Sequence, residues 1–492
     1  MHAKNLISNP IWRRCNREKI RITRKNKREA FEKLKLTFEL WGIIKHYFPD
    51  LIPKLREGHD PRHQSYTEYA NHLVLLTRLI GAVFYIGSMR KLTSELNRKI
   101  CFKNISVMLG LDEELSEIPH WKTINDFLKK LDTDVLEQII PKLVVRLTRM
   151  RAFENSRIRN KYWQIIVDAT HLYTFKERHC DHCLERKFKD KNGVVVRREY
   201  YHCVLEAKLV IGGDIVISIG TEFVENESPE VNKQDCELNA FKRMAKKLKE
   251  RFPRLPICLG MDSLYANDPV FKMCREYGWK YIIRFKDGSI KSVAEEFHAL
   301  KGMEPTQSWE EKEGDITKAY SYVLNIPYQS HSLNIVECKQ SDRVHSFVFI
   351  TCMPITRKNC KQLVEDGRRR WKIENEGFNE QKNGGLNLEH LFCEDYTAIK
   401  NHYFLIQIGH MIAQILARGL KRLKSLSKIS IRDLMAKVKE SFRTEFLTYE
   451  DEVMVNRRRQ YRQRHSTGMG TQTHRPERRR LQEILRRPVS DE

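Results

Sequence analysis

The sequence predicts a fold of the α+β or α/β class, in which a mixed sheet flanked by helices follows an all-helical N-terminal region. In residues 1–155, apolar side chains recur at three- and four-residue spacings, which is the period of amphipathic helices. From residue 162 onward the period changes to short apolar runs, which are typical of buried strands. Helical segments then alternate with these runs, as in a sheet that carries helices on its faces.

The N-terminal helices are expected in four segments, over residues 28–48, 66–86, 88–100 and 121–153. A linker that contains Pro, Gly and Asp, residues 48–65, separates the first two segments. We assign residues 1–155 to a helical domain. Such a domain could bind DNA, form a dimer or simply pack on the rest of the chain.

The sheet is predicted to begin within residues 162–175, where a buried apolar run ends at Asp168. The next two runs form a β-hairpin, residues 200–211 and 214–224, because Gly212-Gly213 between them is a strong turn signal. A helix, a strand, a helix and a strand follow in that order, over residues 231–252, 256–266, 268–278 and 279–288.

An irregular segment interrupts this pattern. Residues 286–346 are predicted to form a β-rich insertion, and the strands expected in and just after it cover residues 321–328, 333–339 and 345–353. The central domain is therefore assigned to two pieces, residues 156–285 and 347–420.

Two helices are expected after the insertion. One long helix is predicted over residues 355–382 with Thr356 as its N-cap, and an apolar helix is predicted over residues 403–423. The remainder, residues 421–492, is assigned to a helical and basic C-terminal tail.

The charge of the chain indicates a polyanionic partner. The 89 Lys and Arg residues outnumber the 64 Asp and Glu residues, which gives a formal net charge of +25. Nucleic acid is the leading partner on this ground, and ribosome, membrane or heparin surfaces are weaker alternatives. The basic segments 13–28 and 456–487 have the composition of arms that neutralise phosphates, or alternatively of solubilising termini.

The sequence also bears on where the protein acts. Its start lacks the apolar run and cleavage site of a secretory signal, and no segment reaches the length of a membrane span. The 12 Cys residues are scattered, which favours reduced thiols over a disulfide framework. We therefore expect a cytoplasmic protein without a membrane partner, associated with the nucleoid if nucleic acid is its partner.

Two aspartates, Asp168 and Asp262, each follow an apolar run that predicts a strand. Sites of open α/β sheets lie at strand ends, so neighbouring strands would bring both carboxylates to one edge. Such a pair suits Mg²⁺ or Mn²⁺, which prefer oxygen ligands. Two ions about 4 Å apart would activate a water or a 3′-hydroxyl and stabilise the leaving oxygen of a phosphodiester. The alternative is that each Asp caps a turn or a helix.

The long helix supplies a third carboxylate. Steps of four residues place Arg370, Glu374, Phe378 and Lys382 along one stripe, so that Glu374 can face the two aspartates while the basic side chains grip phosphates. Glu376 lies about 200° around the helix from Glu374, so both cannot face the same site. The alternative is a solvated helix with many ion pairs.

Taken together, these segments resemble the DDE transposases of bacterial insertion sequences, in the subgroup with a β-rich insertion between the second Asp and the Glu. IIVDAT and LGMDSLYA are similar to the two Asp blocks of that family. The string Arg370-Trp371-Lys372-Ile373-Glu374, followed by Phe378 and Lys382, is similar to its R-W-x-I-E … K signature. The resemblance covers residues from about 160 to 415.

The resemblance implies an RNase H-like fold with three catalytic residues that hold two Mg²⁺ or Mn²⁺ ions, namely Asp168, Asp262 and Glu374. It also implies basic residues that contact the DNA backbone at the transposon ends, namely Arg370 and Lys382, with Arg368 and Arg369 beside them. The enzyme would bind the terminal inverted repeats of its element, cleave the double-stranded DNA and join the freed 3′-hydroxyl to target DNA, as a homodimer on DNA.

Two departures from the family pattern affect these assignments. The family usually has Tyr three residues before the Arg, and this chain has Gly367. Lys382 follows Glu374 by eight residues rather than seven, which keeps Glu376 as an alternative ligand. Two alternative functions also stand beside the transposase: an RNase H-like nuclease that does not join DNA, and a catalytically inactive DNA-binding protein derived from a transposase.

A separate motif gathers His179, Cys180, His182 and Cys183 within five residues. Thiolates and imidazoles are the ligands that zinc prefers, so a zinc site is one interpretation of this motif, though not the favoured one. A structural zinc site needs four ligands, and the usual second pair is missing nearby, so we consider the adjacent His202 and Cys203 as a complement. The alternative is a basic, polar loop near the first Asp that touches DNA.

Overall fold

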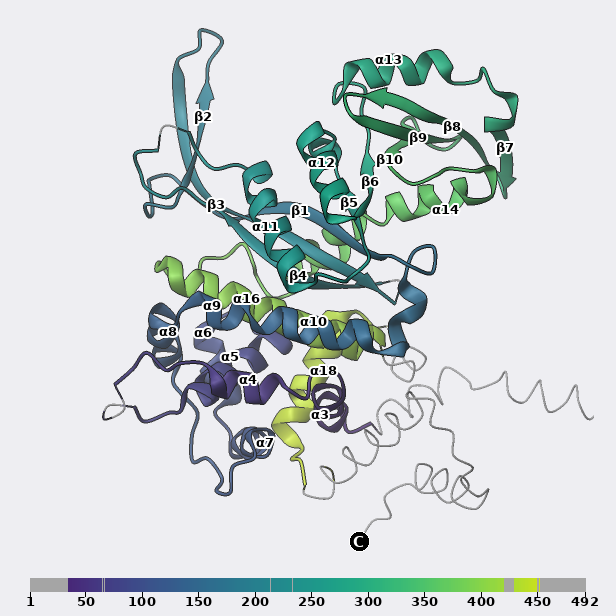
Figure 1. Cartoon of the computed structure of the whole chain (residues 1–492). Coiled ribbons are helices and arrows are strands. Elements are labelled where there is room, and N and C mark those ends of the chain that lie inside the picture. Colours follow the sequence, from purple (N-terminus) through teal and green to yellow (C-terminus); the bar gives the residue numbers. More distant parts are fainter. Residues whose placement is uncertain are drawn as a thin grey trace, which may run out of the picture.

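A ten-stranded mixed sheet runs through the computed structural model, which describes residues 34–448 apart from 64, 66, 213, 232 and 420–428, together with residue 451. The strand order is β2-β3-β1-β5-β6-β10-β9-β8-β7, and β4 pairs with β3. Helices pack against this sheet (Figure 1). The predicted fold class is therefore confirmed, and the sheet with its helices is consistent with an RNase H-like core. The basic segments 13–28 and 456–487 lie outside the described residues.

Parallel and antiparallel strands meet at the centre of the sheet. Strand β1 (Trp163–Phe175) is parallel to β5 (Ile257–Met261), which is parallel to β6 (Lys280–Arg284). On its other side β1 pairs antiparallel with β3 (Val195–Ile211), and β3 pairs antiparallel with β4 (Ile215–Val224). The predicted β-hairpin is confirmed by this last pairing.

The turn of that hairpin depends on glycine. Gly212 has a φ of 61°, a left-handed conformation that glycine adopts without steric cost. Helix α11 (Glu237–Arg251) follows β4, and α12 (Asp268–Tyr277) connects β5 to β6. Asn267 caps α12, and Gly278 ends it with a φ of 70°.

A long β-arm projects from the body of the molecule (Figure 1). It consists of β2 (Leu184–Lys189) paired antiparallel with the first half of β3. Val194 and Val196 near its tip are 60% and 65% exposed. Because β3 is 17 residues long, its second half lies in the core while its first half stands in solvent.

The insertion is β-rich, as expected, and it extends the main sheet. Strand β10 (Phe347–Thr351) pairs antiparallel with β6, and β9 (His331–Gln340), β8 (Ile316–Tyr328) and β7 (Ser308–Glu313) continue outward from it. The sequence patterns missed β7 and also helix α13 (Lys291–Leu300), which covers these strands.

The N-terminal region is helical, as predicted, over the residues that the structure describes, from 34 onward. Its helices are α3 (Leu36–Tyr47), α4 (Leu51–Glu57), α5 (Asn71–Val83), α6 (Met89–Leu96), α7 (Lys99–Leu109), α8 (Trp121–Lys130), α9 (Thr133–Glu137) and α10 (Ile139–Arg149). The expectation of a linker over residues 48–65 was wrong in part, because α4 lies within it. Leu51 and Leu55 of α4 are fully buried. Their burial stabilises a short helix in the middle of a segment whose ends contain Pro and Gly.

Helix α16 (Tyr396–Gln414) joins the helical region to the sheet. Sixteen of its nineteen residues are buried, and Asn401 donates hydrogen bonds to the carbonyls of Leu128 and Leu131 at the end of α8 (2.9 and 2.7 Å). Helix α18 (Ile431–Thr444) also packs on N-terminal helices. Asn104 of α7 donates to the Phe442 carbonyl of α18 at 2.9 Å. Among the described residues, no helix is both long and apolar enough to cross a membrane.

Candidate active site

Asp168 lies near the middle of β1, where the sheet register fixes its position. Ile166 of β1 pairs with Gly260 of parallel β5. Asp168 and Asp262 each follow their member of this pair by two residues. Successive side chains of a strand alternate between faces, so these two positions share one face and one edge of the sheet. The topology therefore brings the two carboxylates to the same place.

The surroundings of Asp168 are strongly charged. Its Oδ2 accepts a hydrogen bond from Arg370 Nη1 at 2.8 Å, and its Oδ1 accepts one from the backbone N–H of Ala169 at 3.1 Å. Burial raises the pKa of Asp168, while the charge of Arg370 lowers it. The charges of Asp262 and Glu374 raise this pKa further. Asp262 and Glu374 are therefore near enough for their charges to act on Asp168.

Asp262 also has a local structural role. Its Oδ1 accepts a hydrogen bond from the backbone N–H of Leu264 at 2.9 Å, so it caps the short turn after β5. One carboxylate oxygen is used by this cap. The cap fixes the carboxyl group at the edge of the sheet.

Glu374 and Glu376 have different surroundings. Glu374 is exposed on the side of Asp168, whose pKa its charge raises. Glu376 instead accepts a hydrogen bond from Lys372 at 3.0 Å, and Lys372 also pairs with Asp214 in the β3–β4 turn. Of the two, Glu374 is the one whose charge raises the pKa of Asp168.

The prediction of one regular helix over residues 355–382 was wrong. Helix α14 (Arg357–Arg368) ends at a turn, and a π-helix, Ile373–Asn379, precedes the short α15 (Glu380–Asn383). Thr356 caps α14 as expected. A π-helix has more residues in each turn than an α-helix, so side chains four apart no longer share one stripe.

The predicted stripe is broken accordingly. Phe378 is fully buried with Ile373, Ile166 and Val210, whereas Glu374 is exposed. The π-helix therefore turns its apolar side chains onto the sheet and leaves Glu374 on the open side.

A comparison with protein families was made on the whole chain. The family described as "Transposase DDE domain" matches residues 159–412, which is more than half of the 492 residues. The chain belongs to this family. Its members are phosphoryl-transfer enzymes that act on DNA and use divalent metal ions. No curated protein gives a significant match to the sequence.

The donor set of this transposase domain fits divalent metal ions. Carboxylate oxygens are the ligands that Mg²⁺ and Mn²⁺ prefer. The charges of Asp262 and Glu374 both raise the pKa of Asp168, and a cation beside these carboxylates would offset that effect. Arg370 is the cationic side chain that pairs directly with Asp168.

Both departures from the family pattern have structural reasons. A Cβ atom at Gly367 would lie 2.7 Å from the ring of Phe349, so α14 packs too closely on β10 to hold a Tyr there. The π-helix lies between Glu374 and Lys382. A π-bulge adds one residue to a helical turn, which accounts for a spacing of eight in place of seven.

The predicted DNA-binding residues do not all lie at the carboxylates. Arg368 and Arg369 pair with Glu365 and Asp366 of their own helix, at 3.3 and 3.7 Å. Lys382 pairs with Glu389 at 2.7 Å. Only Arg370 among the four directly contacts one of the three carboxylates.

Lys382 lies on the β1 side of the transposase domain. Burial lowers the pKa of His171, and the charges of Arg186 and Lys382 lower it further. His171 follows Asp168 by three residues on β1. Lys382 is therefore near enough to this part of β1 for its charge to act on His171.

A fourth carboxylate, which sequence patterns missed, borders the site. Glu237 at the start of α11 accepts a hydrogen bond from the hydroxyl of buried Tyr265 at 2.6 Å. Burial raises the pKa of Glu237, the Tyr265 hydrogen bond lowers it, and the charges of Asp262 and Asp168 raise it. In the sequence, Glu237 is recognisable only as a Glu in the first turn of a helix. A Glu at that position usually interacts favourably with the helix dipole and need not belong to a site.

The zinc motif is rearranged relative to its prediction. Cys180, Cys183 and His202 bring ligand atoms within 4.8 Å of one another, and we call these three residues the Cys–His cluster. His179 and His182 are turned to the carbonyls of Glu394 and Asn226, each at 2.9 Å. Within the cluster, a hydrogen bond from Cys180 lowers the pKa of Cys183 despite its burial, and His202 lowers it further.

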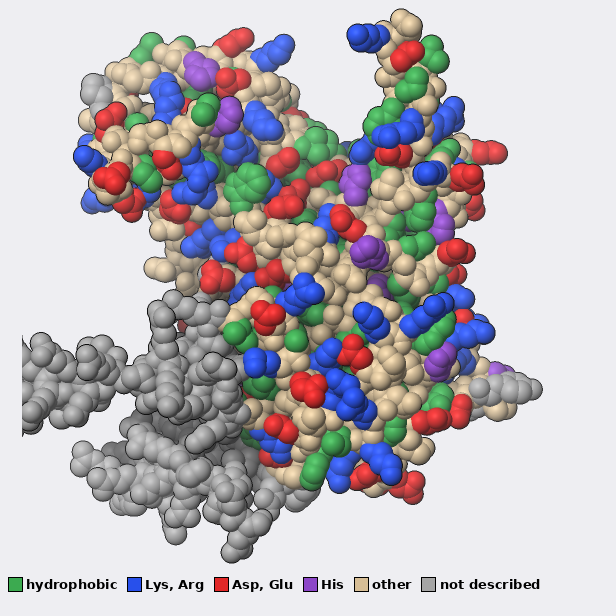
Figure 2. All heavy atoms as spheres, turned by 180° about the vertical axis from the view of Figure 1, so that it is seen from behind, with side chains coloured by type: hydrophobic (Ala, Val, Ile, Leu, Met, Phe, Trp, Pro, Cys, Tyr) green, Lys and Arg blue, Asp and Glu red, His purple; other side chains and the backbone are tan. Residues whose placement is uncertain are grey.

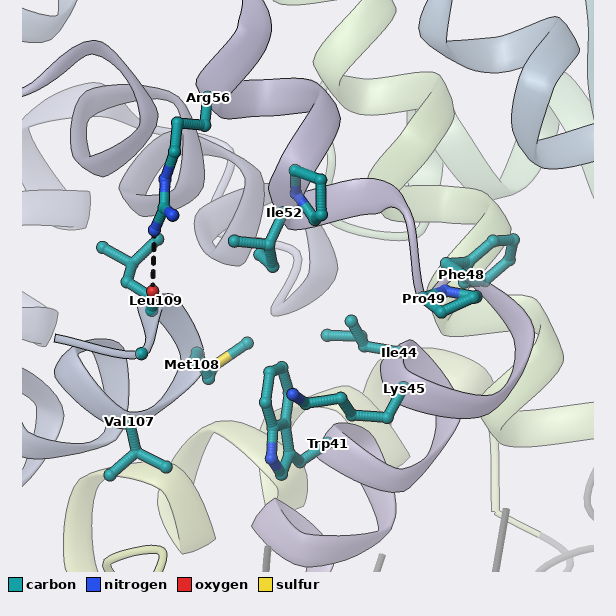
Figure 3. Close-up of a pocket in the computed structure, with 12 residues that line it drawn as sticks. Trp41, Ile44, Lys45, Phe48, Pro49, Ile52, Arg56, Val107, Met108 and Leu109 are labelled. Atoms are coloured by element: carbon teal, nitrogen blue, oxygen red, sulfur yellow. Dashed lines mark hydrogen bonds between the residues drawn. The ribbon is translucent and has the colours of Figure 1, made fainter. Parts of the chain in front are cut away.

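A pocket in the N-terminal helices is separate from both sites. It is lined by side chains of α3, α4 and α7, including Trp41, Ile44, Ile52 and Met108 (Figure 3). Arg56 crosses it and donates to the Leu109 carbonyl at 3.0 Å. This pocket has no carboxylate, thiol or imidazole among its lining residues.

Proposed function

We propose that the chain is the transposase of a bacterial insertion sequence, which binds the terminal inverted repeats of its element, cleaves the DNA there and joins the freed 3′-hydroxyl to target DNA. The proposal is supported by the family match together with the sheet register, which sets Asp168 and Asp262 two residues beyond paired Ile166 and Gly260, and by Glu374, whose charge raises the pKa of Asp168. We also infer the subgroup with a β-rich insertion, because strands β7 to β9 lie between the second Asp and the Glu.

We assign these three carboxylates as the catalytic residues and the ligands of two Mg²⁺ or Mn²⁺ ions. Such ions, when bound, activate the attacking water or 3′-hydroxyl and stabilise the leaving oxygen. Asp168 and Asp262 are held rigidly by the sheet and by the cap at Leu264, whereas Glu374 comes from the exposed side of the π-helix. The chain thus supplies two fixed ligands and one more exposed ligand.

The basic residues around the site have distinct proposed roles. Arg370 holds the Asp168 carboxylate at 2.8 Å, and its remaining guanidinium N–H groups can contact a phosphate beside the cleaved bond. Lys382 would bind the backbone farther along β1, in competition with Glu389. Arg368 and Arg369 would contribute only from the flank, because they pair with acids of α14.

The expected assembly is a homodimer on double-stranded DNA. A transposase must act on both ends of its element, and we assign one set of Asp168, Asp262 and Glu374 to each chain, so two chains would serve the two ends. DNA as substrate would place the enzyme on the bacterial nucleoid.

The direct test is cleavage of DNA that carries the segments flanking the gene for this chain. Mg²⁺-dependent cleavage at the element ends, followed by joining to a second DNA, is the expected result, and Asp262→Ala should abolish both steps. Cleavage without joining would instead identify a nuclease. Binding without cleavage by the unmodified chain would identify an inactive DNA-binding derivative.

A further inference from the structure

We propose that Cys180, Cys183 and His202 bind a zinc ion that fixes the base of the β-arm. This site is separate from the carboxylates, and it does not depend on the proposed transposition reaction. The three residues come from two segments, the loop between β1 and β2 and the strand β3. A metal ion at this point would link that loop to the strand.

The three ligand atoms already lie near one another. The Sγ atoms of Cys180 and Cys183 are 3.7 Å apart, and His202 Nε2 lies 3.5 and 3.6 Å from them. Tetrahedral zinc has ligands at about 2.0 to 2.3 Å, so neighbouring ligand atoms are separated by roughly 3.3 to 3.8 Å. The spacing therefore matches three corners of a tetrahedron. Thiolate and imidazole are also the ligand types that favour zinc over Mg²⁺.

His202 is oriented toward the sulfurs by its surroundings. Its side chain is fully buried, and its ring stacks on Tyr396 with a centroid distance of 4.7 Å. Phe175 meets the same ring edge-on at 5.9 Å. Nε2 faces the two sulfurs, while Nδ1 is buried and has no hydrogen-bond partner. Within the described part of the chain, the two thiols are therefore the hydrogen-bond partners of this buried imidazole.

The CxxC loop is closed by backbone hydrogen bonds. The N–H of Cys180 donates to Cys183 Sγ at 3.4 Å, and the N–H of Cys183 donates to the Cys180 carbonyl at 3.3 Å. Asn226, which follows β4, donates from its side chain to the Cys183 carbonyl at 2.9 Å. An N–H that points at a sulfur stabilises its thiolate form, which is the form that binds metal.

The fourth corner of the tetrahedron would be filled by His179 or by solvent. His179 is adjacent to Cys180, and its ring centroid lies 6.1 Å from that of His202. Its Nε2 is within hydrogen-bond distance of the Glu394 carbonyl, so a change of rotamer would be needed to reach the ion. His182 is not assigned, because its Nδ1 lies 2.9 Å from the Asn226 carbonyl and its ring stacks on Tyr396.

The position of the site indicates its role. The loop leaves the end of β1 and enters β2, and His202 lies on β3 at the point where the β-arm leaves the core. The arm carries exposed basic side chains, namely Lys187, Lys189, Lys191, Arg197 and Arg198 (Figure 2). A zinc ion at its base would hold this basic hairpin in a fixed direction relative to Asp168 on the same strand pair.

The test measures metal in the full-length protein, purified without a metal-binding tag. Elemental analysis should find one zinc per chain in the unmodified protein. Cys183→Ser and His202→Ala should lose this zinc, whereas Cys236→Ser, an exposed Cys outside the cluster, should retain it. Cobalt substitution should produce the thiolate-to-metal absorption and the visible bands of a tetrahedral site, without relying on any variant.

Two results would overturn the proposal. One is an unmodified protein that holds no zinc after incubation with Zn²⁺ and gives no cobalt–thiolate absorption. The other is a Cys180–Cys183 disulfide, detected by mass spectrometry, in protein prepared from reducing cells. If the variants fail to fold, the zinc content and the cobalt spectrum of the unmodified protein still decide the question.

Discussion

The carboxylate site has Asp168 on β1 and the Cys–His cluster has His202 on β3, the strand paired with β1, but the two sites are assembled in opposite ways. Asp168, Asp262 and Glu374 come from three elements that are far apart in the chain. The Cys–His cluster comes from one loop and the strand beside it. One set offers hard oxygen ligands and the other offers soft sulfur and nitrogen, so the two sites should select different metals.

The two sites also differ in how their members interact without metal. Burial raises the pKa of Asp168, the charge of Arg370 lowers it, and the like charges of Asp262 and Glu374 raise it. In the Cys–His cluster the members are hydrogen-bonded to each other. Like-charged carboxylates suit metal ions that bind with the substrate and exchange. Ligands that are already hydrogen-bonded to one another suit a metal ion that remains bound.

The largest expected effect is a loss of Mg²⁺-dependent cleavage that leaves the zinc content unchanged. Asp168→Asn should reduce Mg²⁺-dependent DNA cleavage at least about 100-fold, because even residues that only support a metal ligand are worth 10- to 100-fold. The zinc content should not change. Asp315→Asn, at the exposed β7–β8 turn, is the matched control and should cleave normally. Cleavage by Asp168→Asn at the rate of this control would remove Asp168 from the site.

The second effect concerns the β-arm. Cys183→Ser should make the Lys and Arg residues of the arm about tenfold more sensitive to trypsin, because loss of the zinc link lowers the local stability of the hairpin. DNA cleavage should fall less than in Asp168→Asn. The measurement is the rate at which arm fragments appear, with Cys236→Ser as the control. Equal rates in the two variants would show that the cluster does not hold the arm.

A third prediction uses pH. Burial raises the pKa of Asp168, so its ionisation costs stability as the pH rises through the folded value, and protonation at lower pH removes a metal ligand. The charge of Arg370 lowers this pKa. Arg370→Gln should therefore move the acidic limb of the pH–activity profile to higher pH. The profile of single-turnover cleavage measures this shift, and a limb that moved to lower pH would contradict the assignment.

The smallest effect concerns the packing that holds α14 on the sheet. Gly367→Ala places a Cβ atom 2.7 Å from the Phe349 ring, and overpacking of this kind costs about 1 to 3 kcal/mol. Denaturant unfolding should show this loss. Gly288→Ala, where a Cβ atom would meet no neighbour within 4 Å, is the control and should be nearly neutral.

The sheet and both aspartates were predictable from the sequence because their signals are local. A buried apolar run predicts a strand, and the Asp that follows the run is visible without any knowledge of topology, although β1 continues past Asp168 to Phe175 because its pairing with β3 extends that far. The hairpin at Gly212 has a turn signal of the same local kind. The helix within the linker was missed because Pro and Gly at its ends concealed two buried leucines, Leu51 and Leu55, whose tertiary packing decides its structure.

The remaining errors concern residues that only tertiary structure brings together. The π-helix could not be predicted, because an ideal helical period places Phe378 and Glu374 on one stripe. In the structure, Phe378 is buried with Ile166, and this tertiary contact separates it from exposed Glu374. Glu237 joins the site only through the packing of α11 on the sheet. In the zinc motif, the histidine that lies with the two cysteines is His202 on β3. The histidines next to the cysteines in the sequence, His179 and His182, contact backbone carbonyls instead.

The central claim is that Glu374, and not Glu376, completes the carboxylate site. Its most direct test is Mg²⁺-dependent cleavage of the element ends by Glu374→Gln and Glu376→Gln, measured side by side. Glu374→Gln should be inactive, while Glu376→Gln should cleave within a few-fold of the unmodified enzyme and lose about 1 kcal/mol or less with its Lys372 ion pair. Active Glu374→Gln beside inactive Glu376→Gln would contradict the account.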